Sequence, residues 1–496
     1  MRATPENSAA KCKEALHLPR RKKGEQWPPM RARLRVRSRY PGGLFMQMND
    51  FQEVIKIRNL YKALRKCCKG TMWKDGTAMY RWDGLENSVK LRASYLNGSY
   101  KLQRYLHFYI TRPKPREITA TRIRDRHGQR SACDNVLYPL LTRSFIHDNG
   151  ACQVGKGVDY AINRVKCGLQ RMYRKQRRER AQAAGCRVED IGPFQPEGWV
   201  YKGDIRKYFP SSLHRVAKDT IRAKLGSPKL AAMFCGVIES FGEAWWEDMA
   251  TRAGADGKAA KAFSRAVTDA RTEREMLPLR PEADREAIAR KCETQIRAAV
   301  AKLPGLTQEG RAQILAEALG DEARGIGLGS QISQLVQLAQ LDEIDHYATE
   351  VARPEFYNRY MDDFILADTD RGKLEAAACE IEGRLTVKGL ALNAKSQLIP
   401  LRSGFVFLKW HLYLTDTGKV VMRAAQGVAK EEKRRLRRMV QKVREGTATV
   451  ASVRAHYEGW WAHMARGDTR RLLEQMDKYL ADLLAGLDGQ ERKEKQ

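Results

Sequence analysis

The stretch Phe356-Tyr-Asn-Arg-Tyr-Met-Asp-Asp-Phe-Ile-Leu-Ala-Asp368 places two adjacent carboxylates, Asp362 and Asp363, between two apolar segments. The apolar residues on both sides predict a pair of β-strands that meet at this doublet. Aspartate is depleted from strands, and two neighbouring anions repel each other. A bound cation would offset this repulsion, so the doublet is a candidate cation site. By itself, however, an Asp-Asp pair is more often part of a turn.

A second candidate carboxylate is Asp204, which follows the apolar segment Trp199-Val-Tyr201. This segment predicts a buried strand, although Asp204 alone would also fit a helix N-cap. If Asp204 meets the doublet in space, the three carboxylates suit two Mg²⁺ ions about 4 Å apart, with Mn²⁺ as a substitute. Such ions activate a 3′-hydroxyl group and stabilise a leaving pyrophosphate. Magnesium favours a few carboxylates together with phosphate oxygens of the substrate.

The composition predicts a partner of negative charge. The 496 residues carry a formal net charge of +32, and 30% of them are charged. Nucleic acid is the default partner for such a chain, although a ribosomal-type or membrane-surface protein shares this charge. The sequence has no apolar run of membrane-spanning length and no secretory signal at its start. Ten cysteines without a CxxC pair favour a reducing compartment, so we expect a cytoplasmic protein with no membrane partner.

The composition changes along the chain and predicts five parts. They are a basic, disordered tail (1–45), a mostly helical N-terminal extension (46–110), a mixed core (111–415) with a helical insertion at about 246–324, a helical region (416–487) and a tail (488–496). Met46 and Met48 open the second part, and either is an alternative start of the protein.

Six collinear motifs resemble those of bacterial reverse transcriptases of the group II intron and diversity-generating retroelement type. They are HFYITRPKPREITATRIRDR (107–126), DIRKYFPS (204–211), GIGLGSQISQLVQLAQLDEIDHY (325–347), RYMDDFILAD (359–368), GLALNAKS (389–396) and GFVFLKW (404–410). The resemblance implies an α+β, right-hand polymerase of fingers, palm and thumb. It also implies an RNA-directed DNA polymerase that uses an RNA template and dNTPs and makes cDNA.

The same resemblance implies a role for individual residues. Asp204 and Asp362 would be the main metal ligands, with Asp363 beside them and the Ile205 carbonyl completing a metal shell. Lys395 would lie near the leaving pyrophosphate as a proton donor. The residues that would contact the nucleotide are Lys114, Arg116, Phe209, Gly329, Ser333 and Gln334. The residues of a primer grip would be Phe407, Leu408 and Trp410, with Lys409 in place of the family's usual glycine.

Several of these residues also fit a simpler role. Phe209, which would exclude a 2′-hydroxyl group by its bulk, fits a core position equally well. Lys395 fits a surface lysine, and Lys114 and Arg116 fit a solvated basic loop. The residues from Ser330 to Tyr347 predict an amphipathic helix with an inward face formed by Ile332, Leu335, Leu338, Leu341 and Ile344.

The pattern around Leu328, Gly329 and Ser333-Gln334 resembles the enzymes of diversity-generating retroelements and of related defence-associated lineages. The N-terminal extension and the insertion favour the defence-associated type. This type implies a dedicated noncoding RNA as template, and a homo-oligomer is compatible with it. The alternative is error-prone copying in a diversity-generating retroelement. A non-catalytic RNA-binding protein with a polymerase-like fold is the alternative from another class, and the three aspartates argue against it. Phe209 and YMDD argue against an RNA-dependent RNA polymerase.

Overall fold

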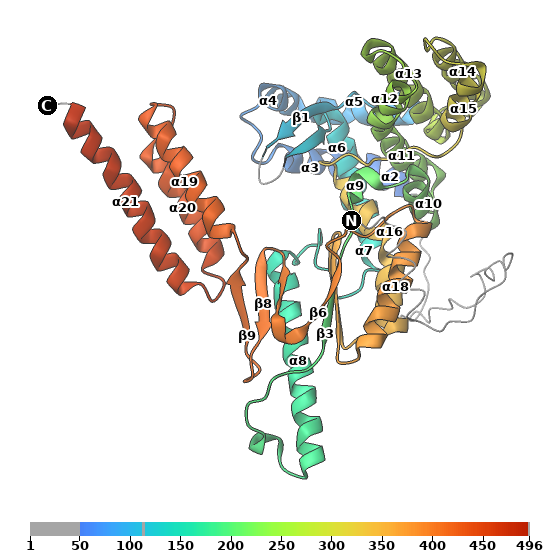
Figure 1. The fold of residues 1–496 in the computed structure, drawn as a ribbon. Helices are drawn as coiled ribbons and strands as arrows, with labels where there is room; N and C mark the ends of the chain where they lie inside the picture. The colour runs from blue at the N-terminus through green and yellow to red at the C-terminus, as the bar shows by residue number, and fades with distance from the viewer. Residues whose placement is uncertain (1–49, 112–114, 495–496) are drawn as a thin grey trace. The chain divides into compact units, whose positions relative to one another are not determined.

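The computed structural model describes residues 50–111 and 115–494, and the side chains of residues 51–111 and 115–487 (Figure 1). The chain divides after Asp50, and everything below concerns the unit that begins at Phe51. The expected disordered tail (1–45) and Lys114 lie outside the described residues. The unit has an α+β fold that is mostly helical and contains small antiparallel sheets, so the predicted class is confirmed.

The first part of the unit consists of short helices followed by a β-hairpin. Its elements are α2 (Asp50–Ile55), α3 (Ile57–Cys68), α4 (Asp75–Trp82), α5 (Gly84–Leu96), β1 (Leu106–Ile110) and β2 (Arg116–Ala120). Helix α3 has a strong apolar face, and its Leu60 is buried in the same core as Ile332 and Leu335 of α16 (Gln331–Gln340). This shared core joins the N-terminal helices to the central part of the chain.

The central sheet has four antiparallel strands in the order β4-β5-β3-β6. Their bounds are β3 (Trp199–Asp204), β4 (Phe356–Tyr360), β5 (Asp363–Asp368) and β6 (Gln397–Pro400). Strands β4 and β5 are the expected pair on either side of the doublet, and they form a hairpin. Strand β3 lies next to β5 although more than 150 residues separate them in the sequence.

Alternation along these strands gives the sheet two apolar faces. Phe356 and Ile365 pack with α8 (Val158–Ala184), whereas Tyr357 and Leu366 pack with α18 (Arg371–Val387). Because side chains alternate along a strand, neighbouring apolar residues serve opposite faces. The sheet is therefore buried on both sides and holds the ends of β3 and β5 in a fixed register.

Helices around this sheet complete the central part. They are α6 (Ile123–Ala132), α7 (Tyr138–Thr142), α9 (Tyr208–Ser211), α10 (His214–Lys224), α11 (Pro228–Glu239), α16 and α17 (Asp342–His346), with π-helical turns at Cys133–Leu137 and Tyr347–Ala352. The inward residues predicted between Ser330 and Tyr347 are all buried. The expected single helix is wrong in detail, because it is interrupted at Leu341 between α16 and α17.

Residues 243–319 form four helices: α12 (Glu243–Arg252), α13 (Gly257–Glu275), α14 (Arg285–Ala301) and α15 (Gln308–Leu319). They have a core of their own, which includes Trp246, Phe263 and Ile296. The segment is rich in alanine, which costs little conformational entropy in a helix.

The last part begins with a three-stranded sheet of β7 (Phe405–Phe407), β8 (Trp410–Leu414) and β9 (Val420–Ala424). Three helices follow: α19 (Val428–Arg444), α20 (Val450–Met464) and α21 (Arg470–Glu494). Their apolar residues, among them Leu436, Tyr457 and Met476, form a further core. Helix α21 continues to Glu494, into the segment 488–496 that the sequence predicts to be a tail. No helix in the described part of the chain has the length and apolar character needed to cross a bilayer.

Candidate active site

The three aspartates that the sequence singles out lie at one end of the central sheet. Asp204, the last residue of β3, is directly opposite Asp363, the first residue of β5. Side chains in such positions of an antiparallel pair have Cβ atoms about 4.5–5.5 Å apart on the same face. Asp362 precedes β5, and its carbonyl accepts a hydrogen bond of 3.2 Å from the backbone N–H of Ile205. All three side chains are half-buried, whereas Ile205 itself is buried.

The hairpin turn that carries Asp362 has a left-handed residue. Met361 has φ +56°, a conformation that costs a side-chain-bearing residue about 1 kcal/mol or more. The turn is fixed from inside the protein by Arg359, whose Nη1 donates a hydrogen bond of 3.0 Å to the Met361 carbonyl. Arg359 is buried, so its position depends on its own partners.

A buried carboxylate holds Arg359 in place. Asp345 of α17 accepts hydrogen bonds from Arg359 Nε (2.7 Å) and Nη2 (2.6 Å), and a third from the Tyr357 hydroxyl group (2.7 Å). Such a two-point contact between guanidinium and carboxylate fixes orientation as well as distance. Asp345 and Arg359 therefore act as positioning residues for the turn. Sequence analysis missed both, since nothing in the sequence pairs them.

The close fit of β3 against β5 depends on Gly203. A Cβ atom at this position would lie 2.0 Å from Cζ of Phe364, the residue opposite it. The Phe364 ring therefore occupies the space that a side chain would fill. This packing sets the spacing of the two strands one residue before Asp204 and Asp363.

The loop that contains Lys395 is bonded to the same strand end. Asn393 N–H donates to the Asp204 carbonyl (2.7 Å), Arg206 N–H donates to the Ala391 carbonyl (2.8 Å), and Ser396 Oγ accepts from Asp204 N–H (3.1 Å). Lys395 is exposed within this loop, and its backbone N–H donates to Asn393 Oδ1 (3.2 Å). The backbone of Lys395 is thus tied to the aspartate end of the sheet.

Phe209 lies near this end of the sheet, in helix α9. It is half-buried and packs against the core beneath α18, with its ring 5.9 Å from that of Tyr208. Tyr208 is buried and donates a hydrogen bond to the Gln337 carbonyl, and burial raises the pKa of its phenol well above the usual value. Phe209 is thus partly exposed and also packed against the core, which suits both a contact with the sugar of a nucleotide and a core position.

The segment around Gly329 lies against β2. The Leu328 carbonyl accepts a hydrogen bond of 2.9 Å from Thr119 N–H, and Gly329 has φ +116°, which favours glycine. Gly329 and Gln334 line a cleft of about 630 Å³, whereas Ser333 is fully buried in the core. Arg116, the first residue of β2, is exposed.

Cys152 is another residue that sequence analysis missed. It lines the same cleft, and its Sγ lies 3.7 Å from Gln334 Oε1 and 3.7 Å from Met361 Sδ. Cys152 thus links α16 to the turn before Asp362. Its φ of +51° is unusual for a residue other than glycine, but this signal appears only in the structure.

The segment predicted as a primer grip forms a tight hairpin. Phe407 pairs with Trp410 across a two-residue turn in which Leu408 has φ +47° and Lys409 has φ +72°. These left-handed values define the turn type that suits the twist of a hairpin. Lys409, in place of the family's usual glycine, therefore adopts the left-handed conformation of a tight turn. Phe407 and Trp410 are buried, and Leu408 packs beside them.

A different acidic cluster lies where the insertion meets α10 and α11. Glu239, Glu275 and Asp321 have carboxylate oxygens within 4.8 Å of one another, a spacing that could hold a metal ion. The ammonium group of Lys218 lies among them, at 3.0 Å from Glu239, 2.7 Å from Glu275 and 2.5 Å from Asp321. The cationic position is thus taken by a side chain of the protein.

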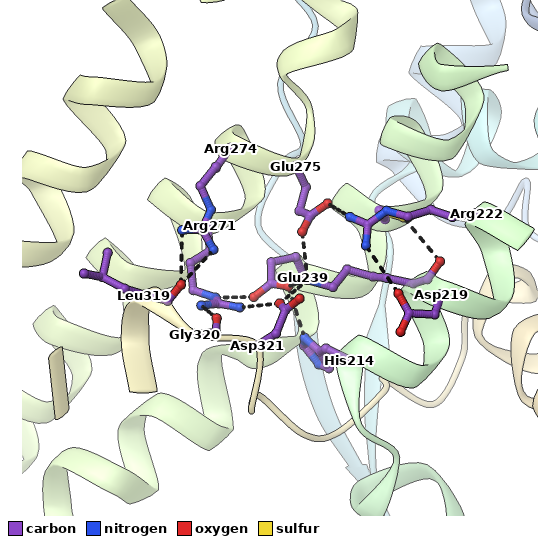
Figure 2. Close-up of polar contacts among 12 residues, drawn as sticks. His214, Asp219, Arg222, Glu239, Arg271, Arg274, Glu275, Leu319, Gly320 and Asp321 are labelled. Atoms are coloured by element: carbon purple, nitrogen blue, oxygen red, sulfur yellow. Dashed lines mark hydrogen bonds and ion pairs between the residues drawn. The ribbon is translucent and has the colours of Figure 1, made fainter. Parts of the chain in front are cut away.

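Arginine and histidine side chains complete this cluster. Arg271 donates to Glu239, to the Gly320 carbonyl (2.6 Å) and to Asp321 (3.3 Å) (Figure 2). It also donates to the Ala318 carbonyl (2.6 Å). Burial alone would raise the pKa of Glu239, but the neighbouring His214 and the charges of Arg271 and Lys218 outweigh it. They hold the pKa of Glu239 well below its usual value of 4.5. The cluster is therefore a structural ion network that joins the insertion to α10 and α11.

Comparison with known proteins identifies distant similarities to solved structures. No protein-family model and no curated protein matches the chain. Among solved structures, telomerase from Candida albicans, determined with the TWJ fragment of telomeric RNA, is similar over 82% of this chain at 11% identity and a TM-score of 0.34. Apo telomerase from Candida tropicalis is similar over 72% at 12% identity and a TM-score of 0.31. The chain spans 60% and 56% of the lengths of these two proteins.

Proposed function

We propose that this protein is an RNA-directed DNA polymerase of the right-hand type, which copies an RNA template into cDNA. The observation that carries the proposal is the register of β3 and β5, which brings Asp204 opposite Asp363 with Asp362 in the adjoining turn. Asp204 is far in sequence from Asp362 and Asp363, which belong to the YMDD motif that resembles reverse transcriptases. The net charge of +32 supports a nucleic-acid substrate.

The residues at this site suit Mg²⁺, with Mn²⁺ as a substitute. Asp204, Asp362 and Asp363 supply hard oxygen ligands, and their half-buried side chains are accessible to an ion and to substrate phosphates. The Ile205 carbonyl is a further ligand under this proposal. Two such ions would lower the pKa of the attacking hydroxyl group and offset charge on the leaving pyrophosphate. Arg359 and Asp345 then hold the turn that presents Asp362.

Other residues take roles around the reacting nucleotide under the same proposal. Phe209 limits the space beside the sugar, and Lys395, in a loop bonded to Asp204, donates a proton to the leaving group. Gly329 and Gln334 line the cleft beside the Met361 turn and contact the incoming base pair. Lys114 and Arg116 bind the triphosphate, and the hairpin of Phe407, Leu408 and Trp410 supports the primer.

Primer extension by the purified full chain tests the proposal. With a supplied RNA template, DNA primer, dNTPs and Mg²⁺, the wild type is expected to extend the primer. Asp362→Asn is expected to lower the rate by about a thousandfold, because several kcal/mol of charge stabilisation are lost. Asp190→Asn, at an exposed position, is the matched control. Equal extension by Asp362→Asn and the wild type would contradict the assignment.

Phe209→Ala tests the sugar selectivity in the same assay. The smaller side chain is expected to increase incorporation of ribonucleotides relative to deoxyribonucleotides. An unchanged ratio would leave Phe209 with a packing role alone.

For the biological role, we propose synthesis of cDNA from a dedicated noncoding RNA in an antiphage defence system. The long insertion, with a core of its own, supports a specialised function. Sequencing of cDNA from cells with the native locus tests this, with an Asp362→Asn and Asp363→Asn strain as control. Uniform or repetitive cDNA that increases on phage infection is the expected result. Substitutions scattered at template adenines would instead establish a diversity-generating retroelement enzyme.

A further inference from the structure

The turn after α3, helix α4 and the start of α5 display large apolar side chains on the surface. The side chain of Trp73 is 77% exposed and that of Trp82 is 90% exposed. Met72, Met79 and Leu85 of the same region are also exposed. An exposed tryptophan pair within a short segment is unusual for a folded chain and marks a contact surface.

This surface borders a basic cleft of about 830 Å³, which Trp82 and Met72 line. The cationic residues of its lining are Lys62, Arg65, Lys66, Lys69 and Arg81. None of the described residues that line it is an aspartate or glutamate. Lys66 forms an ion pair of 2.7 Å with Asp134, and the Arg81 guanidinium lies 5.1 Å from the centre of the Tyr61 ring. The cleft therefore combines positive charge with exposed aromatic rings.

We propose that this aromatic-basic cleft, formed by Lys62, Arg65, Lys69, Arg81 and Trp82 with Trp73 beside it, binds single-stranded RNA. Indole rings provide flat surfaces on which unpaired bases stack, and lysine and arginine neutralise the phosphates between them. The choice of RNA over DNA rests on the proposed function of the protein. The cleft lies on helices outside the sheet that carries the three aspartates, so it is a second nucleic-acid site.

Charge favours this ligand over other occupants. An apolar protein segment would contact the tryptophans but would supply no negative charge to Lys62, Arg65 and Lys69 in the lining. Residues 1–49 carry 12 Lys and Arg against 3 Asp and Glu, so like charge opposes their binding in the cleft. An RNA strand satisfies both the rings and the cations.

Binding of a fluorescent oligouridylate to the full-length protein tests the proposal. Trp73→Ala with Trp82→Ala is expected to raise the Kd at least about fivefold, since stacking contributes about 1–3 kcal/mol per base. The double change to phenylalanine is expected to restore most of the affinity, because it restores a ring. Val387→Ala is the matched control, since Val387 is 81% exposed at the end of α18 and does not line the cleft.

The salt dependence separates the phosphate contacts from stacking. Lys69→Ala is expected to reduce the slope of log K against log salt by about 0.7, the value for one contact to a single strand. The tryptophan variants are expected to weaken binding without changing that slope. Melting temperatures and circular dichroism of all variants establish that they are folded.

Three results would overturn the proposal. The first is wild-type affinity in the double alanine variant. The second is full affinity in a double leucine variant, which would indicate an apolar contact in place of stacking. The third is tighter binding of oligodeoxythymidylate than of oligouridylate. Because the cleft is tested by binding and the polymerase site by primer extension, the two proposals fail separately. If the Asp362→Asn variant binds oligouridylate and extends primers as fast as the wild type, only the catalytic proposal is contradicted.

Discussion

Two sets of three acidic residues in the described part of the chain differ in what surrounds them. Glu239, Glu275 and Asp321 surround the ammonium group of the fully buried Lys218. The second cluster, Asp204, Asp362 and Asp363, is half-buried at the end of two strands. Close carboxylates alone therefore do not identify a metal site. The first set surrounds a buried ammonium group of the protein, whereas the three aspartates are half-buried at a strand end.

The two clusters also differ in the part of the chain that they organise. The Lys218 network joins α10 and α11 to α13 and to the segment after α15, so it fixes the insertion on the central part. Charges buried in this way are retained only when each has partners. The aspartate cluster instead depends on backbone register and on Arg359, which support the turn and leave the carboxylates accessible.

The largest effect on stability is expected from Lys218→Met. It leaves Glu239 buried with one cation fewer, so we expect unfolding to become easier by about 3–5 kcal/mol. Urea unfolding, followed by tryptophan fluorescence, measures this change. Lys90→Met is the matched control, because Lys90 forms an exposed ion pair with Glu86, and its unfolding midpoint is expected to equal that of the wild type.

A second variant makes this test specific to charge. Lys218→Met combined with Glu239→Gln removes one charge of each sign and is expected to recover part of the lost stability. If the double variant is less stable than Lys218→Met, the network is held mainly by packing, and the contrast with the aspartate cluster fails.

Arg359→Lys is expected to affect both stability and activity. Lysine keeps the charge but cannot make the two-point contact with Asp345 and also reach the Met361 carbonyl. We expect a loss of about 2 kcal/mol in the free energy of unfolding, together with slower primer extension. Arg371→Lys, at an exposed pair with Glu375, is the control. Reduced stability with normal extension would mean that the turn does not depend on Arg359.

Gly203→Ala changes the strand spacing beside the aspartates. Its Cβ would meet the Phe364 ring at 2.0 Å, and such overpacking costs about 1–3 kcal/mol. Thermal unfolding and primer extension are both expected to show the change, and Phe364→Leu in the same chain is expected to relieve it. Gly226→Ala is the control, because nothing lies within 4 Å of its added Cβ. Wild-type unfolding temperature and primer extension in Gly203→Ala would show that β3 and β5 change their spacing at little cost.

The pH dependence of stability distinguishes His127, whose pKa shift comes from burial, from Glu239, whose shift comes from its charged neighbours. Burial lowers the pKa of His127 to about 4 from its usual 6.5. The unfolded chain binds the proton first, so this contribution to stability is present above pH 6.5 and is lost as the pH falls toward 4. Glu239 has a lowered pKa as well, so its contribution to stability is fully present above pH 4.5 and is lost as the pH falls from 4.5 toward the lower pKa of the folded state.

Urea midpoints measured across this range test the order of the two losses. The wild type is expected to lose stability first between pH 6.5 and 4, and His127→Gln is expected to remove that slope. A slope that persists in His127→Gln would assign it to another group.

Much of the aspartate site could be predicted from the sequence, because local pattern decides it. Alternating apolar residues around Asp362-Asp363 define the hairpin, and Trp199-Val-Tyr201 defines β3. The buried face of α16 follows from helical spacing in the same way. The break at Leu341 does not, since it depends on how two helices pack.

The sequence by itself determined the element types and the identity of the three aspartates, since period-2 and period-3.6 patterns are local properties of the chain. Only the tertiary structure decided which charged groups meet. Asp345 with Arg359, Lys218 with its three carboxylates, and Cys152 beside Met361 are pairings across strands and helices. Their energies depend on burial and on distance within a folded chain, and a list of residues specifies neither of these.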